Sequence, residues 1–423
     1  MAYIRRVVDD ELDELLRGVA AVALEGPKAI GKTATAIQRA HTVHQMDDPA
    51  QLEIAAAEPA RLVEGKSPIL IDEWQRFPSS WDLVRRSVDQ NPAPNRFLLT
   101  GSANSSNPAT HSGAGRIVRV RMRPLSLAER GLAVPTVSLR LLLEGRRPSV
   151  TGETRVTLRG YADEIVASGF PAIRTMSGRA LRAQLESYIA RVVDKDFQEL
   201  GYTVRNPELL LRWMRAYAGA SSTTMTLEKI RDAATSGEDA KPSRDVTINY
   251  RSALESLWLL DPVPAWTPSR NPIGRLTHPN KHQLVDPGLA ASLLGKTVAA
   301  LLEGKDSGVD IPRDGTLLGQ LFESLVTQSV RVYAQAGEAD VRHLRTKNGR
   351  QEVDLIVVRP DQRVVAIEVK LARSIKEDDV KHLLWLRDEI QDDLLDSVIL
   401  TTGPDAYRRK DGIAVVPAAL LGP

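Results

Sequence analysis

The sequence contains no cysteine, which excludes disulfide bonds, thiolate metal sites and cysteine nucleophiles. It also lacks an excess of charge of either sign, because 56 lysines and arginines face 54 aspartates and glutamates, for a net charge of +2. Any nucleic-acid binding must therefore come from local basic patches. The first residues run into an acidic stretch at 9–11, and the most apolar later stretch, 288–302, is interrupted by Lys296 and is too short to span a bilayer. We expect a soluble, cytoplasmic protein without membrane contact.

A chain of 423 residues is long enough for two or three domains, each with its own core. A stretch with glycine, proline and arginine at 134–151 and a Gly- and Asp-bearing stretch at 304–308 mark the boundaries that we expect. The predicted domains are residues 1–135, 155–305 and 311–423.

The most informative stretch follows an apolar run at 19–24 and precedes a predicted helix start at 34–37. It consists of Gly26, Pro27, Lys28, Ala29, Ile30, Gly31, Lys32 and Thr33. A G-x-x-x-x-G-K-T spacing between a strand and a helix is the phosphate-binding loop signature. The glycines let the backbone curl so that successive N–H groups point at phosphate oxygens, next to the positive end of a helix. We expect Lys32 to reach the β and γ phosphates of ATP and Thr33 to hold Mg²⁺.

A second apolar strand, at 67–73, ends in Asp72 and Glu73. In nucleotide hydrolases the first such acid supports the magnesium ion and the second orients or deprotonates the attacking water. We assign these roles to Asp72 and Glu73. The alternative is that both acids only cap the helix predicted at 74–88.

Two further segments contribute candidates to the same site. The strand predicted at 96–102 ends in Thr100 and Ser102, which could sense the γ-phosphate or serve turn chemistry alone. The alternating strand at 116–123 begins with Arg116, which could stabilise phosphate charge in its own or a neighbouring subunit, or lie on a solvated edge strand. The expected nucleotide contacts are the loop residues with Ala34, Asp72 and Thr100, and the expected catalytic residues are Lys32, Glu73 and Arg116.

The middle of the chain reads as three short helices, at 209–218, 227–234 and 246–260, with a β-like ending at 262–266. This is the layout of a winged helix-turn-helix, in which 247–255, with Arg251, would be the recognition helix. The alternative is a helical module that packs against protein, and the single well-placed basic residue favours it.

The last third contains a predicted hairpin, 352–358 and 364–370, after a helix at 317–334 that carries Glu323. Asp354 and Glu368 lie opposite each other only if the turn has an odd number of residues or a bulge intervenes. Glu368 and Lys370 face the same side. Glu323, Asp354, Glu368 and Lys370 could form a second metal site for phosphodiester attack, whereas the alternative is an ordinary charged hairpin.

A basic turn precedes this hairpin and contains Arg345, Lys347 and Arg350. It could track a phosphate backbone, or it could be a solvated hairpin end.

These motifs resemble a large prokaryotic family of ATP-binding proteins, in which an AAA-type P-loop domain precedes a domain of unknown function with a restriction-endonuclease-like (PD-(D/E)XK) core. The resemblance covers nearly the whole chain. The motifs that carry it, in order, occupy 3–6, 26–33, 71–75, 98–102, 115–129, 169–171, 284–288, 321–323, 352–354 and 367–370. The chain departs from the family pattern at Lys28 and Ala29, where Arg-Gln is usual, at Ala34, which replaces a second threonine, and at Trp74, which replaces a smaller aliphatic residue. None of these departures affects the groups that should hold Mg²⁺-ATP.

The resemblance implies ATPase activity and an α/β fold: an AAA-like P-loop sheet, a helical middle with a winged-helix element and an α/β restriction-endonuclease-like C-terminal domain. Our leading hypothesis is a Mg²⁺-dependent ATPase that switches its C-terminal half, with DNA as candidate partner. The alternatives are a metal-dependent nuclease coupled to the ATPase and a non-catalytic, ATP-gated regulator that binds DNA or protein. An Arg116 that acts on a neighbouring subunit would require a homo-oligomer.

Overall fold

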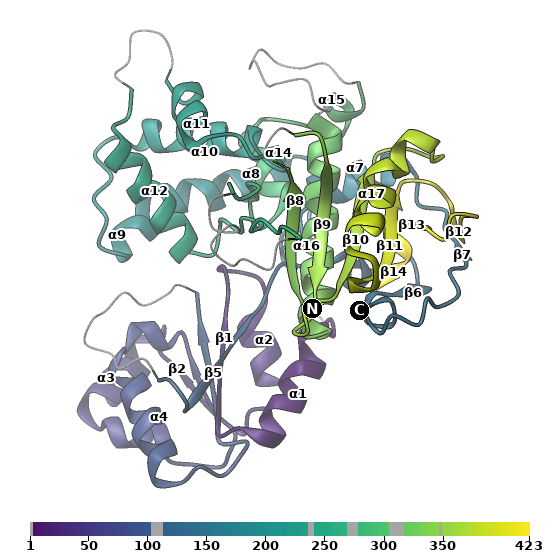
Figure 1. The fold of residues 1–423 in the computed structure, drawn as a ribbon. Coiled ribbons are helices and arrows are strands. Elements are labelled where there is room, and N and C mark those ends of the chain that lie inside the picture. The colour runs from purple at the N-terminus through teal and green to yellow at the C-terminus, as the bar shows by residue number, and fades with distance from the viewer. Residues whose placement is uncertain (1–2, 103–112, 236–240, 269–277, 304–316, 347–348) are drawn as a thin grey trace.

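The N-terminal part of the chain contains a five-stranded parallel sheet, and the phosphate-binding loop follows the C-terminal end of its strand β1, Ala21–Glu25 (Figure 1). The computed structural model describes residues 3–102, 113–235, 241–268, 278–303, 317–346 and 349–423. The strand order is β2-β3-β4-β1-β5. Its strands are β1 (Ala21–Glu25), β2 (Thr42–Gln45), β3 (Ile69–Asp72), β4 (Phe97–Gly101) and β5 (Ile117–Arg121).

Strands β1, β3 and β4 are buried along their whole length, as expected for parallel strands covered on both faces. Alternate residues of each strand join two different cores: Val22 packs with α1, whereas Ala23 packs on the side of α4. The helical segments around this sheet are α1 (Val8–Gly18), α2 (Lys32–Ile37), α3 (Pro49–Ala57), α4 (Ser79–Gln90) and the 3-10 turns η1 (Pro59–Val63) and η2 (Trp74–Arg76). The sequence predicts β1, β3, β4 and β5 of this sheet. It does not predict β2, and the helix predicted at 74–88 is divided into η2 and α4.

A helical domain follows, and side-chain caps fix where several of its helices begin. Asn206 accepts a hydrogen bond from the amide of Leu209, and Asp286 accepts from the amides of Gly288 and Leu289, each ahead of a proline at the first helical position. The helical segments are α7 (Leu158–Ala167), α8 (Gly178–Arg191), the π-helical η3 (Val192–Asp196), α9 (Phe197–Glu199), α10 (Pro207–Gly219), α11 (Leu227–Ala233), α12 (Arg244–Ser256), α14 (Pro287–Leu293) and α15 (Val298–Glu303).

The three short helices predicted in the middle of the chain are therefore present as α10, α11 and α12. After α12 the chain makes isolated antiparallel bridges between Leu260 and Leu284 and between Val263 and Lys281. Three helices followed by short β-bridges is the order of elements that the sequence predicts.

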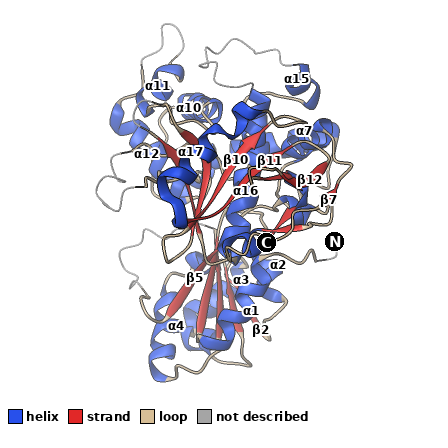
Figure 2. Ribbon diagram, turned by 45° about the vertical axis from the view of Figure 1, so that its right-hand side comes forward, coloured by secondary structure: helices blue, strands red, loops and turns tan. Residues whose placement is uncertain are grey.

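A mixed seven-stranded sheet forms the body of the C-terminal part, with the order β7-β12-β13-β11-β10-β9-β8 (Figures 1 and 2). Its strands are β7 (Gly152–Glu153), β8 (Asp340–Arg345), β9 (Glu352–Val358), β10 (Val364–Lys370), β11 (Leu394–Thr401), β12 (Asp405–Arg408) and β13 (Ala414–Pro417). Helix α16 (Leu317–Ala336) packs in one core with Leu355 and Ile367, and α17 (Lys381–Ile390) packs in the other with Ile356 and Ala366. The remaining 3-10 turns are η4 (Glu377–Val380), η5 (Gln391–Asp393) and η6 (Ala418–Leu420).

The predicted hairpin is confirmed. β9 and β10 pair antiparallel from Val358 with Val364 to Leu355 with Ile367, and the turn at 359–363 holds an odd number of residues. Continuing this register places Asp354 opposite Glu368.

The stretch at 134–151, which we predicted to be a domain boundary, is instead part of the C-terminal body. It contains β6 (Val137–Ser138) and α6 (Leu139–Leu143). Helix α5 (Leu127–Arg130) precedes this stretch, and β7 follows it. β6 pairs in parallel with β14 (Leu421–Gly422), and β7 pairs with β12. Leu139, Leu142 and Leu143 are buried in the large core that also contains α16. The connection between the first two domains is therefore built into the third.

Within the described part of the chain, none of the helices combines the length and apolar character needed to cross a membrane.

Candidate nucleotide-binding site

The phosphate-binding loop connects β1 to α2 and depends on two glycines with positive φ. Gly26 has φ +154°, and a Cβ at this position would lie 2.3 Å from the carbonyl oxygen of Met122. Gly31, with φ +95°, leads directly into α2. A larger residue at Gly26 would displace the loop, because a Cβ has no space there, whereas at Gly31 the positive φ alone opposes a side chain.

The ammonium of Lys32 lies inside the curl of the loop. Its Nζ donates hydrogen bonds to the carbonyl oxygens of Gly26, at 2.9 Å, and Pro27, at 2.8 Å. Only 4% of Lys32 is exposed, and this burial lowers its pKa to about 8 although Glu73 and Asp72 oppose the shift. The loop therefore holds a desolvated cation, to which phosphate oxygens would bind strongly.

Three elements converge on Asp72, at the end of β3. Thr33, in the first turn of α2, donates a hydrogen bond from Oγ1 to Oδ1 of Asp72 at 2.7 Å, and Thr100, on β4, donates to the same oxygen. Asp72 is buried. A hydroxyl and a carboxylate are the hard oxygen ligands that Mg²⁺ uses beside nucleotide phosphates, so this donor set fits the metal.

Glu73 follows Asp72 in a left-handed backbone conformation, with φ +52°, which turns the chain sharply out of the strand. Its Oε2 accepts hydrogen bonds from Ser102 Oγ, at 3.0 Å, and from Gln75 Nε2. The amide of Glu73 donates to Thr100 Oγ1 at 3.2 Å. Glu73 begins η2 without a side-chain capping hydrogen bond, so the alternative in which the acids cap the next helix does not account for it.

Gln75 is the residue of this group to which the sequence analysis gave no role. It also donates to Ser102 at 3.1 Å, so that Gln75 and Ser102 together hold the Glu73 carboxylate in place. Gln75 lies two residues beyond the acid pair, and that proximity is the only signal of its role in the sequence.

The structure does not bring Arg116 to this loop. The parallel register pairs Ala21 with Ile117 and Glu25 with Arg121, so Arg116 precedes the N-terminal end of β5, whereas the loop follows the C-terminal end of β1. At about 3.3 Å per residue, the length of the strand separates them by roughly 17 Å. Arg116 Nε instead donates to Asp89 Oδ1 at 2.7 Å. Its action on the nucleotide of its own subunit is excluded, and the alternative in a neighbouring subunit remains a prediction.

Lys28, in the middle of the loop, joins it to the helical domain. Its Nζ lies 2.7 Å from Asp196 Oδ1 and 3.0 Å from Glu199 Oε2. Asp196 ends the π-helical segment η3, and Glu199 lies on α9. π-Helical turns are rare and are frequent at functional sites. The loop and the helical domain are thus connected by an ion pair whose aspartate is almost completely buried.

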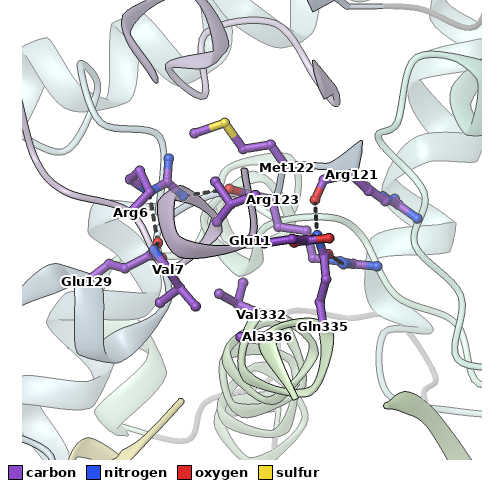
Figure 3. A pocket seen from close by; sticks show the side chains of 11 residues that line it. Arg6, Val7, Glu11, Arg121, Met122, Arg123, Glu129, Val332, Gln335 and Ala336 are labelled. Atoms are coloured by element: carbon purple, nitrogen blue, oxygen red, sulfur yellow. Dashed lines mark hydrogen bonds and ion pairs between the residues drawn. The ribbon is translucent and has the colours of Figure 1, made fainter. Parts of the chain in front are cut away.

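A small cavity lies at the junction of α1, the segment after β5, and α16 (Figure 3). Arg6 reaches across it, donating to the carbonyl oxygens of Ile30, at 3.0 Å, and Arg123, at 2.8 Å, and pairing with Glu129 at 2.9 Å. From α16, Gln335 Nε2 donates to the Arg121 carbonyl oxygen at 2.9 Å. Arg6 and Gln335 therefore connect the phosphate-binding loop and β5 with the C-terminal body.

The second group of candidates also comes together. Glu323 lies on α16, Asp354 on β9, and Glu368 and Lys370 on β10, where Lys370 Nζ donates to Glu368 Oε1 at 2.8 Å. A fifth residue, Lys281 of the helical domain, lies between Glu323 and Asp354. Among the residues that the structure describes, no group of three or more histidines, aspartates and glutamates has an arrangement that could hold a metal ion. These residues do not fit a metal as they are placed here.

Two of the remaining basic candidates are paired with acids. Arg251, on α12, lies 3.3 Å from Glu255, and Arg345 lies 3.5 Å from Glu352. Lys347 lies outside the described residues.

Three regions of the chain match known family models. Residues 19–130 match an AAA domain, residues 158–299 match a domain of unknown function (DUF8612), and residues 318–421 match another domain of unknown function (DUF4143). The N-terminal part is therefore an AAA-type domain, which indicates an ATP-binding ATPase.

Two mycobacterial proteins are similar to this chain: "Uncharacterized protein Mb2031c" of Mycobacterium bovis and "Uncharacterized protein Rv2008c" of Mycobacterium tuberculosis. Each is 27% identical over 218 residues, which cover 50% of this chain and 43% of the relative. The matched part thus spans less than half of the length of these relatives.

Proposed function

We propose that the chain is a Mg²⁺-dependent ATPase that uses ATP binding and hydrolysis to switch its helical domain and C-terminal half. The observation that carries this proposal is the convergence of Thr33, Thr100 and Asp72 at the end of β3, directly beside the loop that encloses Lys32. An ion bound by Thr33 and Asp72 would neutralise charge on the β and γ phosphates. Lys32 would bind the phosphates, and Glu73, held by Gln75 and Ser102, would orient or deprotonate the attacking water.

The switch that we propose begins at Lys28. The triphosphate of ATP brings several negative charges to the loop that carries this lysine, and these charges compete with Asp196 and Glu199 for its ammonium while repelling both carboxylates. ATP binding would therefore loosen the contact between the loop and η3–α9. Hydrolysis and phosphate release would restore it.

The direct test is ATP turnover by the purified chain with Mg²⁺. Lys32→Ala should abolish ATP binding, because it removes the cation that the loop encloses. Glu73→Gln should bind ATP and fail to turn it over, because the amide cannot accept the proton of water. Turnover of Glu73→Gln at the wild-type rate would refute the assignment of Glu73.

DNA is the partner that we propose for the switched half, and the α10–α12 helices with the following β-bridges support it as a winged helix-turn-helix layout. Turnover should be measured alone, with duplex DNA and with single-stranded DNA. Stimulation by DNA would connect the two halves of the chain, whereas equal rates would favour a protein partner and a non-catalytic, ATP-gated regulatory role.

The nuclease alternative would use Glu323, Asp354, Glu368 and Lys370 within a restriction-endonuclease-like domain. The helix α16 and the β9–β10 hairpin provide the residues that this chemistry needs, but Lys281 lies among the carboxylates. Cleavage of plasmid DNA in Mg²⁺ or Mn²⁺ by the wild type and not by Asp354→Ala would establish the nuclease.

A further inference from the structure

The acidic centre of the C-terminal domain contains a lysine from another domain. Lys281 Nζ lies 2.8 Å from Glu323 Oε1, 3.1 Å from Asp354 Oδ1 and 3.9 Å from Glu352 Oε1. Only 1% of Lys281 is exposed, which places it among the largest fully buried side chains of the described residues. Lys281 belongs to the region 158–299, whereas the acids belong to the region 318–421.

The backbone on both sides of Lys281 fixes the position of its side chain. Lys281 exchanges two backbone hydrogen bonds with Val263, at 2.8 and 2.9 Å. The amide of His282 donates to the carbonyl oxygen of Thr223 at 2.8 Å, and the amide of Asp261 donates to that of Gln283 at 2.9 Å. The ammonium therefore lies between the carboxylates because the surrounding chain holds it there.

The charges around Lys281 keep its ammonium protonated. An isolated buried lysine loses its charge, but here Glu323, Asp354 and Glu352 outweigh burial and raise the pKa of Lys281. The neighbouring imidazole of His343 is neutral at physiological pH, since burial and Lys281 lower its pKa to about 3. Lys281 is thus the cation that compensates the carboxylate of Asp354 and contacts the carboxyl group of Glu323, whose pKa burial raises to about 8.

A third acid of this centre, Glu368, has a carboxyl oxygen without a hydrogen-bond partner among the described residues. Glu368 is 4% exposed, its Oε1 accepts from Lys370, and its Oε2 has no hydrogen-bond partner in the structure. Burial, reinforced by the charge of Asp354, raises the pKa of Glu368 to about 8. Asp354 Oδ2 accepts a hydrogen bond from the amide of Val369 at 2.9 Å. Its other oxygen, Oδ1, accepts from the ammonium of Lys281.

We propose that this centre is a latent divalent-metal site in which the ammonium of Lys281 takes the place of the metal. A divalent ion needs carboxylate oxygens at about 2.0–2.6 Å, and it cannot share Glu323 Oε1 and Asp354 Oδ1 with an ammonium that contacts both. While Lys281 is in place, the centre binds the helical domain to the C-terminal domain and does not take up a metal. Removal of the ammonium leaves buried carboxyl groups without their cation, so that they must take up either protons or a metal ion.

The experiment measures Mn²⁺ binding by electron paramagnetic resonance of the full chain, without nucleotide. All variants carry Asp72→Asn, so that the phosphate-loop site contributes no carboxylate. The variants compared are the Asp72→Asn parent, Asp354→Asn, Lys281→Ala, Lys281→Ala with Asp354→Asn, and Lys229→Ala as a matched control for loss of an exposed lysine. Thermal unfolding is followed with and without Mn²⁺ in each case.

We expect the parent and Lys229→Ala to bind no Mn²⁺ specifically and to keep the same Tm with and without it. Lys281→Ala should bind one equivalent and should regain, with Mn²⁺, most of the Tm that it loses. Addition of Asp354→Asn should abolish this binding and the rescue. One specific equivalent in the parent that Asp354→Asn removes would overturn the proposal, and so would a Lys281→Ala chain that Mn²⁺ neither binds nor restores to the folded state.

Discussion

The bridge between Lys28 and Asp196 gives the sharpest test of the proposed switch. Lys28 is about one quarter exposed and Asp196 is 5% exposed, so the pair is intermediate between an exposed and a fully buried ion pair. Exposed ion pairs contribute about 0–1 kcal/mol, and breaking a fully buried pair costs about 3–5 kcal/mol. We expect a coupling free energy of about 2 kcal/mol from a double-mutant cycle of Lys28→Met and Asp196→Asn, measured by urea unfolding without nucleotide.

With Mg²⁺ and a non-hydrolysable ATP analogue, the same cycle should give less than about 1 kcal/mol, because the triphosphate competes for the ammonium of Lys28. The binding of the analogue to each variant is measured separately, so that loss of affinity is not mistaken for loss of coupling. A cycle of Arg61→Ala and Glu58→Gln serves as the control, since that pair is exposed, 3.9 Å apart and outside the proposed switch, and it should give less than about 0.5 kcal/mol. A Lys28–Asp196 coupling that stays the same or grows with the nucleotide would refute the switch.

Three further predictions concern the nucleotide site. The pKa of Lys32 is about 8, and phosphate would keep its ammonium charged, so ATP binding should take up a proton above that pH and weaken about fivefold between pH 8 and pH 9. Calorimetry in two buffers of different ionisation enthalpy measures the uptake, and a constant affinity up to pH 9.5 would contradict it. Gly26→Ala places a Cβ against the Met122 carbonyl oxygen at positive φ, so it should lower the free energy of unfolding by about 3 kcal/mol and abolish ATP binding. A variant as stable as the wild type would show that the loop can shift. If Arg116 acts on a neighbouring subunit, a mixture of inactive Arg116→Ala and inactive Glu73→Gln chains should recover turnover, and a mixture without activity would count against that role.

The nucleotide site was accessible from the sequence because its signals are local. The loop at Gly26, the acids after β3 and Thr100 at the end of β4 each follow a buried strand, and the C-terminal ends of parallel strands meet at one edge of a sheet. The prediction for Arg116 in its own subunit was wrong for the same geometric reason. Arg116 precedes its strand, so the parallel direction of β5 carries it to the opposite edge.

The features that the sequence did not predict depend on contacts between distant residues. Lys28 meets Asp196 across 168 positions, and Lys281 meets Asp354 across 73. Neither lysine lies in a periodic pattern that would indicate its partner. The stretch at 134–151 lies between the matches at 19–130 and 158–299, but its pairing with the C-terminal part was not predicted, because β6 and β7 are too short to show alternation and their partners, β14 and β12, come from the other end of the chain.

The pairing of β6 with β14 has a consequence for the synthesis of the chain. A ribosome releases the AAA-type domain long before it makes residues 405–422, so β6 and β7 have no strands to pair with during most of translation. The N-terminal sheet can close early, since all of its strands lie before residue 122. The strands β6 and β7 therefore have no partners until residues 405–422 have been made. Only then can the connecting segment between the first two domains pair with the strands of the C-terminal part.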